Sequence, residues 1–294
     1  MRFTKMHGAG NDYVYIDCMQ GVPAHPEQLA VSMSDRHFGI GSDGLVLIMP
    51  SQVADFRMRM FNADGSEAQM CGNASRCVGK YVYDNGLTDK TDITLETKAG
   101  IKPMRLTVSD GKVSSVCVDM GEPVLKPACI PVALSGERAV AVPLELPGAA
   151  FTMTCVSMGN PHAVIFVPKL SEIDVHKWGP IAEHHALFPE RCNIEFAEVL
   201  SKEEITMRVW ERGAGETLAC GTGACATLVA AVLNGLTDRR ARLRLLGGTL
   251  DITWSENDNH VYMSGGAVTV FTGEWLLQVS FCIECNRKSK RLWH

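Results

Sequence analysis

The sequence of 294 residues predicts an α+β fold with two pseudo-symmetric halves, each a mixed β-sheet curled around a central helix. Three observations lead to this prediction. The chain repeats itself at a fixed offset, each repeat has the same order of strands and one helix, and the second of these helices is apolar on nearly every side. A helix without a polar face must be surrounded by protein, and a curled sheet would surround it.

The internal repeat is anchored by two Cys-Gly pairs. Cys71-Gly72 begins one helix-like stretch and Cys220-Gly221 begins another, so the offset between residues 71 and 220 is 149. Other segments match at the same offset without gaps: Gly10-Asn11 with Gly159-Asn160, Met58-Arg59 with Met207-Arg208, Glu67 with Glu216, and Asn85-Gly86 with Asn234-Gly235. Chance does not align several separated segments at one spacing. We therefore expect the halves to be related by a pseudo-two-fold axis.

Each half contains the same elements in the same order. An early strand, a second strand, a Gly-rich turn, the Cys-Gly pair, a helix and a β-hairpin follow one another. The expected strands are 13–17 and 56–61 in the first half and 162–167 and 205–210 in the second, with hairpins near Ala99-Gly100 and Gly247-Gly248 and a helix over 224–233. We expect residues 1–120 with 266–294 to form the N-terminal half, which includes a returning C-terminal strand. Residues 121–265 should form the C-terminal half.

Composition and charge favour a soluble protein that acts on small molecules. The chain is 46% hydrophobic and 21% charged, with a formal net charge of −5, and its one basic cluster, at 287–291, is typical of a solvated tail. No segment approaches the ~20 apolar residues of a membrane helix, and residues 1–11 lack the apolar core of a signal peptide. We therefore expect a cytoplasmic protein with neither a nucleic acid nor a membrane as partner.

The chain has eleven cysteines, an odd number that favours a reducing compartment. Most should be small buried hydrophobic residues. A structural zinc site usually needs two closely spaced cysteine pairs, whereas only Cys282 and Cys285 have that spacing. We expect no metal site.

Cys71 and Cys220 each stand directly before a helix. The free N–H groups and the dipole of a helix start favour negative charge, so a thiol there should ionise more easily and a carboxylate should bind. Gly72 and Gly221 would let a ligand approach the backbone closely. If the two-fold axis brings both thiols to one cleft, the α-carbon of a bound amino acid would lie between them. One thiolate would remove the α-proton and the opposite thiol would return one to the other face, without a cofactor. The alternative is that both Cys-Gly turns are structural remnants of the duplication.

Polar residues in nearby turns favour the catalytic interpretation. The halves are alike at the cysteines and differ around them, which suits a substrate with an asymmetric side chain. Arg212 has the chemistry to bind a distal carboxylate bidentately. Each of these residues also has a structural interpretation, since an Asn in a turn often bonds its own backbone and His162 can be a satisfied structural histidine. The candidates are Asn11, Asn62, Asn160, Asn193, His162, Glu211 and Arg212.

Several segments of the chain resemble the diaminopimelate epimerase family. They occur in the order of the family's motifs, and the resemblance extends to about residue 274, leaving the tail from Trp275 without a counterpart. The matching segments are 5–12 (KMHGAGND), 39–44 (GIGSDG), 61–66 (FNADGS), 70–73 (MCGN), 159–162 (GNPH) and 211–223 (ERGAGETLACGTG).

The resemblance implies a homodimer, with each half a barrel around a helix, that interconverts LL- and meso-diaminopimelate for lysine and cell-wall synthesis without a cofactor. It implies that Cys220 takes the proton and Cys71 gives one in the LL-to-meso direction, while His162 and Glu211 influence the thiols. The residues implied to contact substrate are Asn11, Asn62, Gly72, Asn73, Asn160, Asn193, Glu211, Arg212, Gly221 and Thr222.

Three alternatives make different predictions. A proline- or hydroxyproline-type racemase on the same scaffold would use both cysteines but would need Arg212 and the amides less. A thiol hydrolase would use one nucleophilic cysteine with a histidine base, and a binding module would use neither. The duplication of the thiol disfavours the last two.

Overall fold

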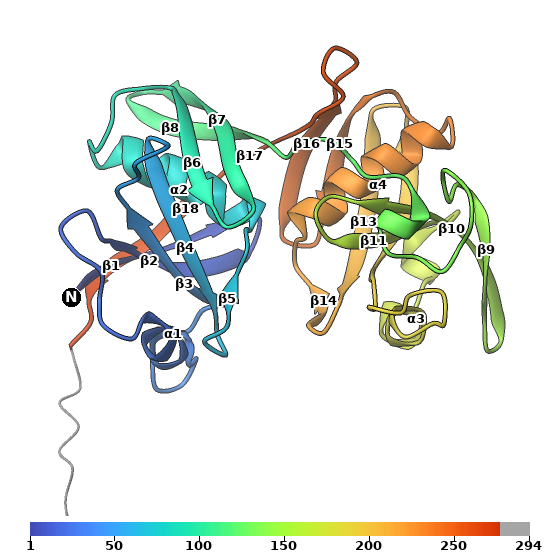
Figure 1. Cartoon of the computed structure of the whole chain (residues 1–294), viewed down its shortest axis with the longest axis horizontal. Coiled ribbons are helices and arrows are strands. Elements are labelled where there is room, and N and C mark those ends of the chain that lie inside the picture. Colours follow the sequence, from blue (N-terminus) through green and yellow to red (C-terminus); the bar gives the residue numbers. More distant parts are fainter. Residues whose placement is uncertain (277–294) are drawn as a thin grey trace, which may run out of the picture.

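A computed structural model of the chain describes residues 1–276. It consists of two lobes that lie side by side, one containing helix α2 (Gly72–Asp84) and the other containing helix α4 (Gly221–Leu233) (Figure 1). The described strands form one continuous hydrogen-bonded network that runs through both lobes. Both helices lie against the inner faces of this network and contribute to one hydrophobic core.

The first lobe is a mixed sheet in which β2 runs parallel to β3 and β4 pairs parallel with β6, while the other pairings are antiparallel. Helix α1 packs on its outer side over a small separate core. Its elements are β1 (Arg2–Gly8), β2 (Asn11–Asp17), α1 (Pro26–Ser34), β3 (Gly44–Met49), β4 (Phe56–Asn62), β5 (Glu67–Ala68), α2, β6 (Asp92–Thr97), β7 (Gly100–Ser109) and β8 (Lys112–Asp119).

The second lobe repeats this plan. Its β11 runs parallel to β12 and its β13 pairs parallel with β15, as β2 and β4 do with β3 and β6. Helix α3 takes the place of α1 on the outer side (Figure 1). Its elements are η1 (Pro127–Cys129), β9 (Val142–Leu146), β10 (Ala149–Ser157), β11 (Pro161–Phe166), η2 (Leu170–Glu172), α3 (Val175–Glu183), β12 (Asn193–Ser201), β13 (Glu204–Glu211), β14 (Gly215–Thr217), α4, β15 (Arg240–Leu245) and β16 (Gly248–Trp254).

The last two strands connect the lobes. Strand β17 (Val261–Gly265) pairs antiparallel with β16 of the second lobe and with β8 of the first. Strand β18 (Val268–Glu274) then pairs with β1. The end of the described chain therefore returns to the lobe in which the chain began.

The central helices end in the same way because the same dipeptide follows each. Asn85 and Asn234 cap the carboxyl ends of α2 and α4, and Gly86 and Gly235 adopt positive φ angles of 72° and 67°. A glycine in this conformation lets the chain leave a helix while the last carbonyls are still bonded. The N–H groups of Gly86 and Gly235 donate to Tyr83 O and Val232 O at 3.0 Å in both lobes.

The fold agrees with the elements expected from the repeat. The predicted strands 13–17, 56–61, 162–167 and 205–210 lie in or overlap β2, β4, β11 and β13, and both hairpins form where expected. Helix α4 has ten buried residues among its thirteen, as its apolar composition requires. Cys282, Cys285 and the basic cluster at 287–291 lie outside the described residues.

Candidate active site

The two predicted cysteines line one cavity between the lobes. Cys71 and Cys220 are the N-cap residues of α2 and α4 and share an extended backbone conformation, with φ and ψ of −136° and 122° and of −118° and 110°. Both are free thiols. The cavity has a volume of about 670 Å³ and takes its lining from both lobes. The expected convergence of the two thiols on a common space is therefore present.

Asn11 and Asn73 surround the Cys71 thiol. Cys71 Sγ donates to Asn11 Oδ1 at 3.3 Å, and Asn73 Nδ2 approaches the same oxygen at 3.4 Å. Asn73 Nδ2 also lies 3.3 Å from Ala219 O, next to the second cysteine. Asn73 thus joins the two helix starts across the cavity.

The helix start only partly offsets the burial of Cys71. Burial raises the pKa of this thiol, while the N–H groups of Ala74 and Asn73 and the charge of Arg76 lower it. As expected, the N–H groups at the helix start lower the pKa of the thiol and so make it easier to ionise. The expectation of a lowered net pKa is wrong, however, because desolvation of the thiolate is the larger effect and leaves the pKa raised.

The pKa of the Cys220 thiol is raised further. Burial raises it well above the usual value, and the charges of Glu211 and Glu195 add to this effect, while the Thr222 hydroxyl and the Gly223 N–H oppose it. Cys220 Sγ lies 3.5 Å from Thr222 Oγ1. The negative charges of the two carboxylates disfavour the thiolate form. This thiol therefore needs a nearby group that accepts its proton before it can act as a base.

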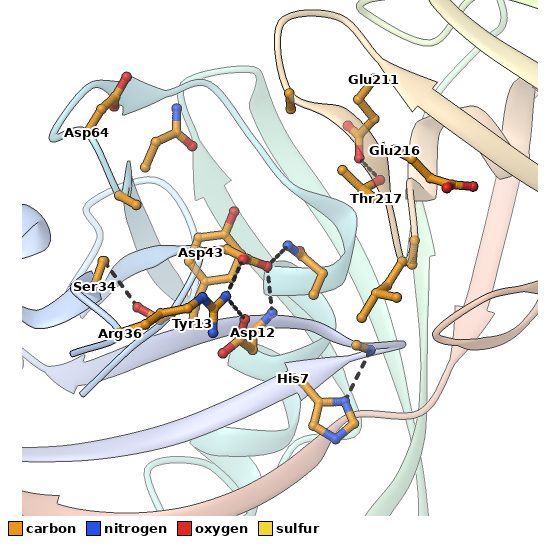
Figure 2. A pocket seen from close by; sticks show the side chains of 18 of the residues that line it. His7, Asp12, Tyr13, Ser34, Arg36, Asp43, Asp64, Glu211, Glu216 and Thr217 are labelled. Atoms are coloured by element: carbon orange, nitrogen blue, oxygen red, sulfur yellow. Dashed lines mark hydrogen bonds and ion pairs between the residues drawn. The ribbon is translucent and has the colours of Figure 1, made fainter. Parts of the chain in front are cut away.

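Glu211 is such a group. Burial raises the pKa of its carboxyl group, and hydrogen bonds from Thr217 and Cys220 lower it. Thr217 Oγ1 donates to Glu211 Oε1, as Figure 2 shows. Because burial raises its pKa, this carboxylate is a stronger base than an exposed one, and its contact with Cys220 places it to accept the thiol proton. Its contact with Cys220 supports the expectation that Glu211 influences this thiol, which stays a prediction.

His162 is fully buried behind the second helix start. Its Nδ1 lies 2.6 Å from Glu195 Oε1 and its Nε2 lies 3.0 Å from Asn160 Oδ1. Sequence reasoning missed Glu195. The available signal was a carboxylate between the apolar residues Ile194 and Phe196, in the first half of strand β12.

The cavity lining contains almost the whole predicted substrate-contact set. Asn193 is the exception: it is not among the residues that line the cavity, and its contact with substrate stays a prediction. Its Nδ2 donates to Pro161 O at 2.9 Å and its Oδ1 accepts from the Arg212 N–H at 2.9 Å, so both ends of the amide are occupied by backbone. The predicted residues that line the cavity are Asn11, Asn62, Gly72, Asn73, Asn160, Glu211, Arg212, Gly221 and Thr222.

A larger cavity of about 1210 Å³ adjoins the first and shares Asn11, Asn62, Glu211 and Arg212 with it. Its wall carries a charged network that sequence reasoning also missed, in which Arg36 reaches the carboxylates of Asp12 at 3.3 Å and Asp43 at 3.0 Å (Figure 2). Asp43 Oδ2 accepts from Asn11 Nδ2 at 2.8 Å. The network therefore supports one of the amides beside Cys71.

The glycines after the two cysteines have a packing role. A Cβ atom on Gly72 would lie 2.5 Å from Met263 Cε, and one on Gly221 would lie 3.0 Å from Met263 Sδ. The side chain of Met263, on strand β17, thus lies close to both helix starts. The close neighbour that the structure shows at both glycines is this methionine, and the expected close approach of a ligand stays a prediction.

Comparison with known proteins shows the family. The family model described as diaminopimelate epimerase matches residues 3–126 and 154–270. A diaminopimelate epimerase of Acetivibrio thermocellus is 62% identical over 274 residues, which cover 93% of this chain and 98% of that protein. One from Desulfovibrio desulfuricans is 60% identical over 283 residues, covering 94% of this chain and 99% of that protein.

Solved structures of lower identity share the fold. A PhzF-family phenazine biosynthesis protein of Enterococcus faecalis superposes with a TM-score of 0.70 at 13% identity, covering 94% of this chain and 99% of that chain. A probable proline racemase of Agrobacterium radiobacter gives 0.69 at 16% identity, covering 94% and 93%. These similarities confirm the two-lobed α+β class. Within residues 1–276 no helix combines the length and apolar character needed to span a membrane.

The family model and the full-length relatives together show that the chain belongs to the diaminopimelate epimerase family.

Proposed function

We propose that the protein interconverts LL- and meso-diaminopimelate, with Cys71 and Cys220 as the two acid/base groups and without a cofactor. The observation that carries the proposal is that both thiols line one cavity between the lobes, each at the start of an equivalent helix. An α-carbon held between them would have one thiol on each face. Such an arrangement inverts a stereocentre by two proton transfers.

The reaction begins with a proton transfer inside the protein. In the LL-to-meso direction Glu211 accepts the Cys220 proton, because burial makes its carboxylate a stronger base than an exposed carboxylate. The resulting Cys220 thiolate removes the substrate α-proton. Cys71, whose Sγ–H is held at 3.3 Å from Asn11 Oδ1, gives its proton to the opposite face. The reverse reaction exchanges the two roles.

The helix starts stabilise the charge that develops on the substrate. The α-carboxylate lies against the backbone of Gly72-Asn73 and of Gly221-Thr222, where the free N–H groups of two helices meet. As the α-proton leaves, negative charge moves onto this carboxylate, and hydrogen bonds to it strengthen. Two helix dipoles that point at the same group add to this effect.

Arg212 recognises the distal end of the substrate. Its guanidinium is exposed, lines both cavities, and is held by a hydrogen bond from Nη1 to Glu190 O at 3.1 Å. Asn193 fixes the backbone of Arg212 at 2.9 Å. A guanidinium presented in this way is suited to the distal carboxylate of diaminopimelate. A proline-type substrate has only its α-carboxylate and lacks a distal carboxylate that Arg212 could bind.

Assembly, location and domain division complete the proposal. We place the enzyme in the cytoplasm as a homodimer. Exposed apolar side chains on β18, namely Val268, Val270 and Phe271, support an interface on the first lobe. We divide the chain into residues 1–120 with 266–294 and residues 121–265, which is supported by the pairing of β18 with β1.

The test is proton exchange with solvent. The protein is incubated with LL-diaminopimelate in D₂O, and NMR follows the α-proton and the appearance of the meso isomer. Cys71→Ala and Cys220→Ala should each abolish isomerisation, while Cys129→Ala, at an exposed cysteine, is the matched control and should keep full activity.

Each alternative activity has its own result. Near-normal activity in either active-site variant would exclude the two-thiol mechanism. Loss in only one variant would point to a single nucleophilic thiol. Exchange on proline without exchange on diaminopimelate would assign the racemase instead.

A further inference from the structure

The two lobes hold equivalent asparagines in different ways. Asn11 and Asn160 occupy the same position in the repeat, and both line the cavity. Asn11 Nδ2 donates to Asp43 Oδ2 at 2.8 Å. An ionised carboxylate only accepts hydrogen bonds, so this contact directs the Asn11 NH₂ group toward Asp43. The Asn11 oxygen is thereby left to face Cys71 Sγ and Asn73 Nδ2.

Asn160 has the opposite orientation. Its Oδ1 lies 3.0 Å from His162 Nε2, and the other ring nitrogen, Nδ1, lies 2.6 Å from Glu195 Oε1. Both ring nitrogens therefore face oxygen acceptors. Only the imidazolium form of histidine donates from both nitrogens. Within residues 1–276 the Asn160 NH₂ group donates to no protein acceptor, so it is available to a ligand in the cavity.

Glu195 provides the charge that the imidazolium requires. Its side chain has no exposed surface, and its Oε2 has no hydrogen-bond partner within the described residues. A carboxylate buried in this way needs a positive partner, and the His162 ring is in direct contact with it. The short N···O distance of 2.6 Å is typical of a charge-assisted hydrogen bond.

We propose that Asp43 and Glu195 are positioning residues that hold Asn11 and Asn160 in opposite orientations, with Glu195 acting through a doubly protonated His162. The site then presents an amide oxygen beside Cys71 and an amide NH₂ group on the Cys220 side. This inference rests on the proposed function and describes how the same site recognises its substrate.

The opposite orientations of the two amides make the two sides of a nearly symmetric site chemically different. An amino acid carries a donor, its ammonium group, and an acceptor, its carboxylate, on one α-carbon. An amide oxygen on one side and an NH₂ group on the other select one placement of these two groups. The carboxylates that set these orientations lie where the repeats differ, because Asp43 has Cys192 and Glu195 has Val46 as counterpart.

The charged groups near Cys220 come from three neighbouring strands. Glu211 lies at the end of β13, Glu195 on β12 and His162 on β11. With His162 as an imidazolium, its charge neutralises that of Glu195. The negative charge that remains beside Cys220 is then that of Glu211, the group that exchanges a proton with the thiol.

Histidine-selective ¹⁵N NMR of the substrate-free protein tests the protonation state, since the imidazolium and the two neutral tautomers give different nitrogen signals. The His162 signals are assigned by their loss in His162→Asn. We expect an imidazolium in the wild type at about pH 7.5 and a neutral ring in Glu195→Gln. A neutral His162 in the wild type, or an imidazolium retained in Glu195→Gln, would overturn the proposal. The wild-type spectrum decides even if the variant does not fold.

Kinetics test the consequence for binding. Glu195→Gln keeps the shape of the side chain, so we expect the melting temperature to change little while KM for diaminopimelate rises roughly 10- to 100-fold through loss of the Asn160 contact. Glu198→Gln, on the same strand, is the matched control and should leave KM unchanged. An unchanged KM in Glu195→Gln would contradict the positioning role. The NMR result does not depend on substrate, so failure of the proposed function would be seen separately, as lack of exchange in the wild type.

Discussion

Gly223 offers a sharp test of how closely Cys220 is packed. It is the third residue of α4, and a Cβ atom placed on it would lie 2.6 Å from Glu195 Oε1 and 3.3 Å from Cys220 Sγ. Contacts below 3.0 Å do not occur for real Cβ atoms, so Gly223→Ala must displace the carboxylate by at least about 0.4 Å. Glu195 is buried and bonded to His162, so it cannot move without disturbing that pair.

The expected effects on stability and activity differ. Replacing a helix glycine by alanine stabilises by roughly 0.5–1 kcal/mol, while overpacking of a buried site costs about 1–3 kcal/mol. We therefore expect the free energy of unfolding in urea to fall by at most about 2.5 kcal/mol. Because a reacting atom misplaced by about 1 Å costs about 100-fold in rate, a shift of a few tenths of an ångström at Cys220 should lower kcat roughly 4- to 10-fold.

The assay compares two glycine variants. Formation of meso-diaminopimelate and urea unfolding are measured for Gly223→Ala and for Gly79→Ala. Gly79 is the matched control because it lies in α2, away from the cavity, and an added Cβ meets only side-chain methyl groups of Leu106 and Val116, at 3.0 and 3.3 Å. It should keep kcat within about threefold. Wild-type kcat in Gly223→Ala would refute the argument that Cys220 and Glu195 are held in a fixed arrangement.

Two further variables act on the buried thiols. Arg76 is fully buried with Nη2 unbonded among the described residues, and its charge lowers the pKa of Cys71. Arg76→Met should therefore raise the pKa of Cys71 and slow its alkylation by iodoacetamide several-fold at about pH 8. Arg105→Met, at an exposed arginine, is the control and should leave the alkylation rate unchanged. Equal alkylation rates of Cys71 in Arg76→Met and in the wild type would contradict this prediction. Burial raises the pKa of Cys155 and Cys225 from 9.0 to about 12. Above about pH 9 the folded state then holds more protons than the unfolded state. The free energy of unfolding should therefore fall between about pH 9 and 12, by up to about 1.4 kcal/mol per pH unit for each thiol. A constant free energy of unfolding in urea between about pH 8 and 10.5 would show that burial does not raise the pKa of these two thiols.

The repeat made much of the fold predictable. The Cys-Gly and Asn-Gly pairs mark the start and end of both central helices, because a helix end has local chemical requirements that a sequence displays. The early strands and hairpins followed from short-range alternation of apolar and polar residues. Pairing across the lobes did not follow, since the partners of β17 are decided by tertiary packing.

The site was predictable where it carries motifs and unpredictable where it depends on burial. Cys71 and Cys220 were identified by their repeat. Glu195 was missed because a carboxylate inside a strand has no local pattern that distinguishes a buried position from an exposed one. Asn193 was assigned to the substrate, although its amide bonds to backbone at both ends. The net change in the pKa of the two thiols was also not predictable from sequence, because desolvation depends on the whole fold.

The pairing of β17 with both β8 and β16 also determines when the chain can complete its folding during synthesis. Its partners lie at 116–119 and 251–254, so neither ladder can form until the ribosome has made almost the whole described chain. Until then, β8 and β16 would each present an open sheet edge, and open edges are templates for aggregation. A product that terminates early, before residue 261, would keep both edges exposed. Quality-control proteases and chaperones would therefore meet a very different molecule if translation stopped shortly before the end.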